Sequence, residues 1–208
     1  MQVLISKVDA VPQDVKNLIS QRISEFESVR HDVAKDVFLE LCFCLMTANF
    51  QAEKSIRIQG EISDGFLKWD VDVLKDKLKV MGHRFWPQRA ERIVEARKHI
   101  PHLVGILRDY SGHDLRMWFV NNVKGLGMKE ASHFLRNIGL KDYAIIDFHI
   151  VDIMVNHGLI EPLPSKSITP RKYLEIEDKL KELGAVLGMD MAELDLYLWY
   201  LETGKVLK

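Results

Sequence analysis

The sequence contains very little cysteine, with only Cys42 and Cys44 among its 208 residues. Both lie in the apolar run LELCFCLMTA, separated by one residue. A zinc knuckle or a four-cysteine iron–sulfur cluster needs more thiolates at a wider spacing, so the sequence excludes both kinds of site. We expect two buried, free thiols in a reducing compartment and no cofactor.

Long hydrophobic runs are also absent. No segment approaches the roughly 20 consecutive apolar residues that a membrane-spanning helix needs, and the N-terminal part lacks the apolar core of a secretion signal. A content of 47% hydrophobic and 28% charged residues is typical of a globular protein. We therefore expect a soluble cytoplasmic protein with no membrane partner.

The sequence has no excess of positive charge, since its formal net charge is −1. This total argues against a nucleic-acid partner, because affinity for a phosphate backbone depends on clustered lysine and arginine. The charge is unevenly distributed along the chain, however. Residues 84–98 and 121–141 each carry a net charge of +3, whereas residues 161–195 are acidic. These windows indicate either a basic face on a neutral protein or ordinary solvated charge.

Hydrophobic periodicity predicts helices throughout, and no alternating pattern typical of a strand lasts six residues. Segment 33–49 is apolar on most sides, which predicts a central buried helix, and Asp70 is a candidate N-cap. Pro12 is expected at the first position of the first helix, whose apolar stripe includes Leu18. The predicted helices lie within residues 11–26, 33–49, 69–81, 87–100, 112–122, 129–138, 148–157, 170–187 and 190–202. The predicted fold class is therefore all-α.

The stretch VKGLGMKEA, residues 123–131, predicts a tight hairpin that leads into a helix. Gly125 and Gly127 stand where we expect the backbone to turn sharply. Lys129 falls in the first helical turn, where the helix dipole disfavours an ammonium by about 0.3–1 kcal/mol. A neutral amine, which is a nucleophile, is therefore favoured at Lys129. The alternatives are a hairpin without a ligand and a solvated surface lysine.

The backbone of this hairpin has groups that suit DNA. The N–H groups from Gly125 to Lys129 lie at a helix N-terminus, where they form an anion site for a phosphate. The carbonyl oxygens of Asn121, Val123 and Leu126 could hold a monovalent cation that bridges to the same phosphate. No other metal site is expected.

Asp147 follows an apolar triplet in the stretch YAIIDFHIVDIM and lies 18 residues after Lys129. One interpretation makes Asp147 the N-cap of the helix predicted at 148–157. In the other, its carboxylate accepts the proton of the lysine amine or stabilises positive charge on a sugar. One side chain can perform both tasks.

The hairpin, Lys129 and Asp147 together resemble the helix-hairpin-helix DNA glycosylase superfamily. Its motif is a Gly-x-Gly hairpin, a lysine two residues later and an aspartate about eighteen to twenty residues further on. The segments LCFCLMTANFQAEK and MGHRFWPQRAERIVEA also resemble the superfamily, so the resemblance covers about residues 38–157. The short chain and its last lysine are most similar to the compact archaeal and bacterial branch of 8-oxoguanine DNA glycosylases with lyase activity. The superfamily's usual proline before the hairpin is replaced by Lys124.

The resemblance implies an all-α fold of two helical subdomains with a DNA-binding cleft between them. A helical barrel is expected at residues 31–139, with the hairpin at 123–128, and a second subdomain at residues 1–30 plus 140–208. The cleft would admit a damaged base flipped out of the duplex, at a cost of a few kcal/mol.

The resemblance also implies the roles of further residues that face DNA. Asn49 would fill the gap left by the flipped base, although it also suits a helix C-cap. Arg84 and Phe85 would contact DNA as a cation and an aromatic wedge, unless Phe85 or its neighbour Trp86 packs in the core. His149 would donate a hydrogen bond to a phosphate, or else serve a structural role within its helix.

Two residues near the end of the chain are implied to line the base pocket. Trp199 would be a stacking platform for the base, but the run LYLWYL is equally typical of a core stripe. Lys208 would recognise 8-oxoguanine with its ammonium and a terminal carboxylate, unless it belongs to a frayed tail. The oxidised base has an N–H donor at its imidazole edge, where guanine has an acceptor nitrogen. A carboxylate, which only accepts hydrogen bonds, would therefore distinguish 8-oxoguanine from guanine.

These observations lead to one predicted function with stated alternatives. We expect a bifunctional DNA repair glycosylase and AP lyase that excises 8-oxoguanine from duplex DNA through a lysine Schiff base and β-elimination. The alternatives are a glycosylase for another oxidised base, a non-catalytic helix-hairpin-helix DNA-binding module, and an all-α interaction domain. The expected partner is double-stranded DNA with a damaged base, bound by a monomer that associates with the nucleoid.

Overall fold

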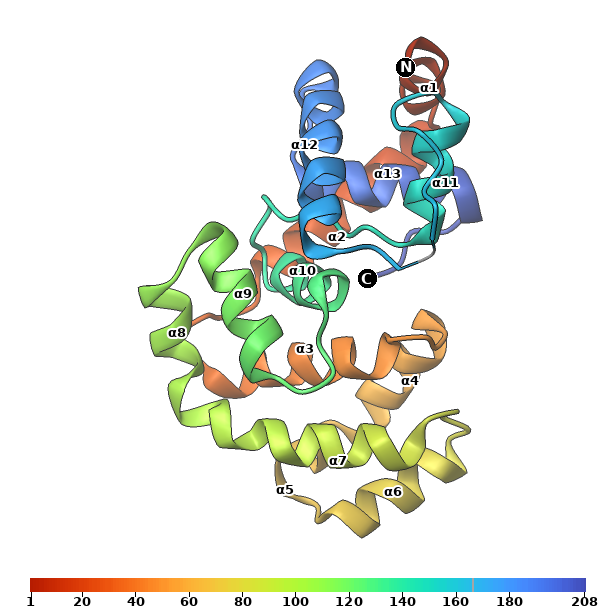
Figure 1. Ribbon diagram of the computed structural model, residues 1–208. Coiled ribbons are helices and arrows are strands. Elements are labelled where there is room, and N and C mark those ends of the chain that lie inside the picture. The colour runs from red at the N-terminus through yellow and green to blue at the C-terminus, as the bar shows by residue number, and fades with distance from the viewer. Residues whose placement is uncertain (166) are drawn as a thin grey trace. The chain divides into compact units, whose positions relative to one another are not determined.

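The computed structural model describes residues 1–165 and 167–208, and this part of the chain contains helices and no strand (Figure 1). The predicted all-α class is therefore confirmed. The chain divides into two compact units, one of Val29–Ile138 and one of Met1–Ser28 with Gly139–Lys208. The assignment of residues 31–139 and of 1–30 plus 140–208 to the two sides of a DNA-binding cleft stays a prediction.

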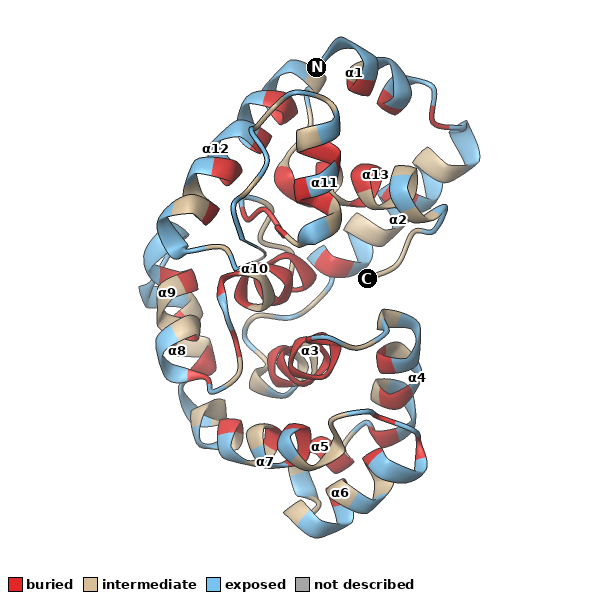
Figure 2. Ribbon diagram, turned by 45° about the vertical axis from the view of Figure 1, so that its right-hand side comes forward, coloured by how far each residue is buried: buried red, intermediate tan, exposed pale blue. Residues whose placement is uncertain are grey.

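The unit of Val29–Ile138 is built around one central helix. Its elements are α3 (Ala34–Thr47), α4 (Ala52–Ile62), α5 (Gly65–Lys68), α6 (Val71–Val80), α7 (Trp86–Ala96), the 3₁₀ helix η1 (Arg97–His102), α8 (Leu103–Asp109), α9 (Gly112–Asn122) and α10 (Met128–Asn137). Helix α3 contacts α4, α7, η1 and α10, and Figure 2 shows both α3 and α10 buried around most of their circumference. The prediction of a central buried helix at residues 33–49, made because that segment is apolar on most sides, is therefore confirmed.

Cys42 and Cys44 lie on α3 with no exposed surface, and both are free thiols. Burial raises the pKa of Cys42 well above its ordinary value, because a thiolate loses its hydration inside the core. The protonated thiol is a poor nucleophile and a poor metal ligand. The prediction of two buried, free thiols is confirmed, and Cys42 contributes to packing.

The second unit contains the N-terminal and C-terminal helices. They are α1 (Gln2–Asp9), α2 (Gln13–Glu27), α11 (Phe148–Asn156), α12 (Pro170–Leu187) and α13 (Met191–Thr203). Helix α13 contacts the other four helices of this unit. Its Leu196 and Tyr197 join Ile19 and Phe26 of α2 in one hydrophobic cluster. Because α13 is enclosed by helices, residues along its length are buried.

Several helix boundaries differ from the sequence prediction. Pro12 is the N-cap of α2 and not its first helical residue, and Leu18 is 40% exposed and so lies outside the core stripe. Helix α7 ends at Ala96, after which the chain tightens into η1, which includes Pro101. Asp70 caps α6 as predicted, since its carboxylate accepts the amides of the second and third residues of the helix. Helices α1, α4, α5 and α8 were not predicted.

Within the described residues, no helix is both long enough and apolar enough to cross a membrane.

Candidate functional site

The hairpin between α9 and α10 turns at one of its two glycines. Gly125 has a φ of +96°, in the left-handed region that favours glycine. Gly127 has φ −95° and ψ −172°, an extended conformation that any residue adopts. The expected sharp turn is therefore correct for Gly125 and wrong for Gly127. A further backbone hydrogen bond closes the turn, from the Leu126 amide to the Val123 carbonyl at 3.1 Å.

Close packing gives a second reason for glycine at position 125. A Cβ atom there would lie 2.6 Å from Cδ of Arg92 and 2.8 Å from one of its guanidinium nitrogens. The guanidinium of Arg92 therefore lies directly against the hairpin backbone. This places a cation beside the amides that are expected to bind a phosphate. Sequence reasoning did not single out Arg92, although it belongs to the basic window 84–98.

Lys129 is the second residue of α10, directly after the hairpin. In α10 the side chains from Ala131 to Asn137 are buried, whereas Lys129 and Glu130 of the first turn keep partial exposure. The Glu130 carboxylate accepts the Gly127 amide at 3.3 Å and so closes the start of the helix. The buried residues from Ala131 to Asn137 thus hold the helix in place. Its first turn presents the Lys129 side chain at the surface of this unit.

The three carbonyl groups considered for a monovalent cation lie at the same turn. Asn121 is in the last turn of α9, while Val123 and Leu126 belong to the connection to α10. The Val123 carbonyl already accepts one hydrogen bond, which leaves its second lone pair for a cation. Cation binding here stays a prediction. Elsewhere in the described part of the chain, no group of three or more His, Cys, Asp or Glu side chains could hold a metal ion.

The C-terminal end of α3 presents Asn49 in an unusual conformation. Asn49 has a φ of +56° and an exposed side chain. Buried side chains satisfy the last carbonyls of the helix: Arg89 donates to Ala48 at 2.6 Å, and Nε2 of His83 donates to Met46 at 3.0 Å. These bonds fix the backbone on which Asn49 projects. The left-handed conformation suits the residue after a helix C-cap, so the C-cap interpretation and an exposed DNA-facing role are compatible.

His83 is a neutral, buried hydrogen-bonding group. Its Nδ1 accepts the Phe85 amide at 3.2 Å while Nε2 donates to α3, which defines a single tautomer. Burial lowers the pKa of His83 below its ordinary value, because the charged ring would lose hydration. Burial also lowers the pKa of Arg89, and the nearby Arg92 lowers it further. His83 and Arg89 are thus structural supports, and sequence reasoning missed both.

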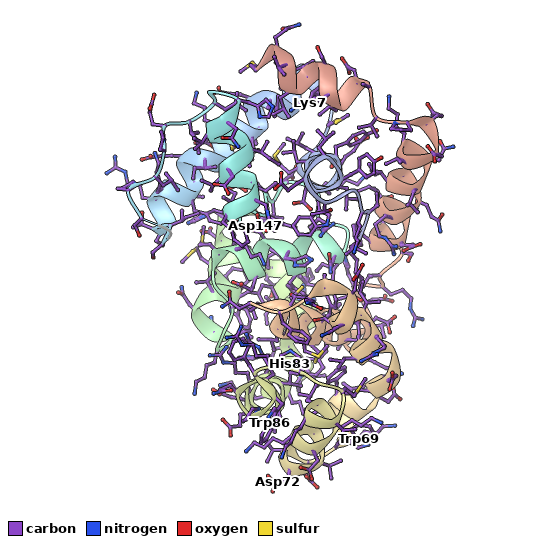
Figure 3. The ribbon with its side chains drawn as sticks, turned by 90° about the vertical axis from the view of Figure 1, so that its right-hand side faces the viewer. Lys7, Trp69, Asp72, His83, Trp86 and Asp147 are labelled. Atoms are coloured by element: carbon purple, nitrogen blue, oxygen red, sulfur yellow. The ribbon has the colours of Figure 1, made fainter. Side chains whose placement is uncertain are left out.

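Arg84 and Phe85 lie at the turn into α7, next to His83 and Trp86 as labelled in Figure 3. Arg84 is exposed, and its guanidinium carbon lies 5.1 Å from the centre of the half-buried Phe85 ring. Trp86 is also half-buried, with the Lys79 amine 5.3 Å from its ring. Both rings are thus partly buried, and neither belongs to the fully buried core. The turn presents cations and aromatic rings together, as a surface for nucleic acid does.

Asp147 belongs to the other unit, where it directly precedes α11 (Figure 3). One of its carboxylate oxygens accepts the Ile150 amide at 3.0 Å, so the predicted N-cap is confirmed. The side chain is only partly buried. Because the cap bond holds the carboxylate in one orientation, the group has a defined position at the surface of its unit.

Aromatic side chains gather beside Asp147. The ring of His149 lies 4.1 Å from that of Phe148 and meets Trp199 of α13 edge to face, with centres 5.4 Å apart. Phe148 is 64% exposed, and Trp199 is half-buried. Nδ1 of His149 also lies 3.5 Å from a carboxylate oxygen of Glu202. The structure therefore brings His149, two residues after Asp147 in the chain, into contact with Trp199, and it adds Phe148, whose exposure the sequence pattern did not reveal.

The segment after α13 leads to Lys208. Val206 packs against the hydrophobic cluster of this unit, so the end of the segment is held near the core and is not a frayed tail. Lys208 itself is partly buried. The contact of Lys208 with a base stays a prediction.

Comparison with known proteins gives closely similar relatives. A family model described as 8-oxoguanine DNA glycosylase matches residues 19–189. An 8-oxoguanine DNA glycosylase/AP lyase of Methanocaldococcus jannaschii is 47% identical over 207 residues, covering 99% of each chain. The protein of the same name from Korarchaeum cryptofilum is 50% identical over 195 residues, covering 93% of this chain and 92% of that protein.

A solved structure is equally similar. The crystal structure of the Methanocaldococcus jannaschii 8-oxoguanine glycosylase/lyase, in complex with a 15mer DNA containing 8-oxoguanine, has a TM-score of 0.94. Its sequence is 46% identical, and the match covers 99% of this chain and 100% of that chain. The likeness thus extends over both compact units.

Proposed function

Because this chain belongs to the 8-oxoguanine DNA glycosylase family, we propose that it excises 8-oxoguanine from duplex DNA and nicks the strand, with Lys129 as nucleophile and Asp147 as its proton acceptor. The membership confirms the resemblance carried by the hairpin, Lys129 and Asp147. The observation that best supports the role of Lys129 is its position: it follows the glycine hairpin and is partly exposed in the first turn of a helix that is otherwise largely buried.

The amine of Lys129 performs the covalent step in this proposal. Its nitrogen attacks the anomeric carbon of the damaged nucleotide, the glycosidic bond breaks, and the base leaves with its bonding electron pair. Loss of a proton from the nitrogen and opening of the sugar give a Schiff base. Removal of a proton from the neighbouring carbon then expels the 3′ phosphate by β-elimination, which nicks the strand.

Asp147 assists the same step electrostatically. A carboxylate can accept the proton that Lys129 loses, and its negative charge offsets the positive charge that develops on the sugar as the glycosidic bond breaks. The cap bond to Ile150 orients this carboxylate before substrate arrives. A group oriented in advance does not need to reorganise during the reaction.

The remaining surface residues bind the duplex in this proposal. The hairpin amides, with Gly125, Gly127 and a cation at Asn121, Val123 and Leu126, hold a phosphate. Asn49, Arg84 and Phe85 contact the region from which the base is removed. His149 donates to a phosphate, and Trp199 stacks on the extruded base.

The DNA-bound Methanocaldococcus jannaschii relative supports the choice of partner. We infer that the chain acts as a monomer on double-stranded DNA with a damaged base. Its place is then the cytoplasm, associated with the nucleoid, because its substrate is genomic.

Borohydride trapping with a panel of duplexes tests the proposal. Each duplex carries one lesion, either 8-oxoguanine, another oxidised base or a preformed abasic site, and borohydride reduces a Schiff base to a permanent protein–DNA adduct. We expect adducts with the 8-oxoguanine and abasic duplexes and none with undamaged DNA. Preferential trapping with another oxidised base would assign a different substrate to the same chemistry. Binding without any adduct would indicate a non-catalytic DNA-binding module.

A substitution in the hairpin should weaken DNA binding in a way that does not depend on the lesion. Gly125→Ala should lower affinity for damaged and undamaged duplexes by the same factor, because phosphate contacts position a protein without reading the base. A side chain at φ +96° and in contact with Arg92 is strained, so the free energy of unfolding should also fall by about 1 kcal/mol or more. Affinities measured at one salt concentration, with denaturant unfolding, check both expectations.

The matched control is Gly105→Ala. Gly105 lies on α8 in the same unit, and a Cβ atom there would meet no atom within 4 Å. This variant should bind like the parent protein and gain a little stability, because alanine favours a helix. If folded Gly125→Ala bound every duplex as tightly as Gly105→Ala, the hairpin would not contact DNA.

Substitution of Lys208 should change the reaction rate by a factor that depends on the lesion. The oxidised base carries a carbonyl oxygen that guanine lacks, and the Lys208 ammonium is a suitable donor to it. Lys208→Ala should slow 8-oxoguanine excision by about 5- to 150-fold, the equivalent of one charged hydrogen bond of roughly 1–3 kcal/mol. Adduct formation at a preformed abasic site should change little. Lys205→Ala is the control, since Lys205 is exposed and close in sequence. Equal losses on both substrates would remove Lys208 from base recognition.

A further inference from the structure

The segment Tyr143–Ile146, directly before Asp147, is buried but belongs to no helix or strand. Relative exposure is 7% or less at each of its four residues. Buried backbone N–H and C=O groups cost free energy unless each has a hydrogen-bond partner. Because this segment has no helix or strand pairing of its own, its buried backbone groups need partners from elsewhere in the fold.

Two side chains of α12 supply these partners. The Glu177 carboxylate accepts the Ala144 amide at 2.9 Å. The Tyr173 hydroxyl donates to the Ala144 carbonyl at 2.7 Å and accepts the Ile146 amide at 3.1 Å. Tyr173 and Glu177 lie one helical turn apart and so share a face of α12. Residues 144 and 146 are therefore both bound from one face of one helix.

Both side chains are almost completely buried, with exposures of 2% for Tyr173 and 1% for Glu177. A buried carboxyl group is costly in free energy, and apolar residues of similar volume often give equal or greater stability. Packing alone does not therefore account for Glu177. Its bond, together with those of Tyr173, fixes the path of the chain at the residue before Asp147.

Asp147 is consequently held from both sides. Tyr173 binds the backbone of Ile146, immediately before it, and the carboxylate of Asp147 binds the Ile150 amide, after it. We propose that Tyr173 and Glu177 are positioning residues, which orient the Asp147 carboxylate for base excision by holding residues 144 and 146. This inference rests on the proposed function, in which Asp147 acts on the nucleophile and the sugar.

The expected size of the effect follows from geometry. Misplacing a reacting group by about 1 Å can lower a rate by about 100-fold, even when the substituted residue is remote from the substrate. Tyr173→Phe keeps the ring but removes the hydroxyl, so the Ala144 carbonyl and the Ile146 amide lose that partner. We expect single-turnover excision of 8-oxoguanine to slow by about 10- to 100-fold. Tyr197→Phe is the matched control, because Tyr197 is also buried in this unit but has no hydrogen bond to residues 143–147 in the described chain.

Comparison of two reactions separates positioning from a general loss of structure. Trapping at a preformed abasic site needs the Lys129 amine but no breakage of a glycosidic bond and no stabilisation of a sugar cation, so Tyr173→Phe should slow it much less than it slows excision. Affinity for the lesion duplex should also be unchanged. A parallel loss of excision, trapping and affinity would show a merely structural role and overturn the inference. Unchanged excision would overturn it as well.

Glu177 gives an independent pair of variants if Tyr173→Phe folds poorly. Glu177→Gln keeps an oxygen that can accept the Ala144 amide and should retain most of the excision activity. Glu177→Met has similar length but no acceptor, and it should slow excision while sparing abasic-site trapping. Equal activity of the two variants would show that the bond to Ala144 does not matter for catalysis.

A double substitution identifies the group through which Tyr173 acts. In the Asp147→Asn background, Tyr173→Phe should have no further effect on excision, because no carboxylate is left to position. An undiminished further loss would mean that Tyr173 acts independently of Asp147, and the inference would fail while the proposed function stands. If Asp147→Asn alone had parent activity, the role of Asp147 in the proposed function would fail first, and the inference with it.

Discussion

Lys129→Gln should abolish both borohydride trapping and strand nicking while duplex binding survives. Glutamine has similar length and polarity, but its amide nitrogen is not a nucleophile and cannot form a Schiff base. Lys129 lies in the first turn of α10, and the buried residues that follow it on α10 hold that helix in place, so the fold should tolerate the change. Trapping on 8-oxoguanine and abasic duplexes, nicking on a denaturing gel and binding at fixed salt measure the three properties.

Lys124→Gln is the matched control for this prediction. Lys124 lies in the same hairpin, is exposed, and has its amine 3.8 Å from the Glu95 carboxylate. The substitution removes the same charge at nearly the same place, so any loss of binding due to charge alone should be similar in both variants. Only Lys129→Gln should lose the adduct. Persistent trapping by Lys129→Gln would assign the nucleophile to another amine.

Local patterns in the sequence were enough to predict many of the elements. Helix periodicity repeats every few residues, and caps such as Asp70 and Asp147 bind amides two or three positions later. The short or strongly polar helices were missed because they carry too few apolar residues to show a period. The conformation of Gly127 was also mispredicted, since an extended glycine and a left-handed one look the same in a sequence.

The buried side chains that hold the site residues in place could not be predicted from such local patterns. Arg89 binds a carbonyl 41 residues earlier in the chain, and Tyr173 binds one 29 residues earlier. A buried arginine or tyrosine has many potential partners, and only the packed structure selects one. The groups proposed to react with DNA were therefore visible as local motifs, whereas the side chains that hold them became visible only in three dimensions.

Asp147→Asn should slow base excision by about 10²- to 10⁴-fold, the range that general acid–base catalysis contributes. The side chain also caps α11, and a substitution that destroyed the cap would confuse catalysis with folding. Asparagine avoids this difficulty because it is as good an N-cap as aspartate, with an oxygen that accepts the same amide. Its neutral amide neither accepts the proton of Lys129 nor offsets positive charge on the sugar.

The excision rate and the thermal stability of the variants, measured together, decide whether Asp147 acts in catalysis or only as a helix cap. Thermal unfolding of Asp147→Asn should match that of the parent protein closely, whereas single-turnover excision should fall steeply and duplex affinity should change little. Asp152→Asn is the control on the same helix, since Asp152 is exposed and carries the same charge. Asp147→Ala should lose the cap as well, with a further cost of about 0.5–2 kcal/mol in stability. If Asp147→Asn excised the base at the parent rate, Asp147 would be a helix cap alone, and the positive charge on the sugar would have to be stabilised by another group.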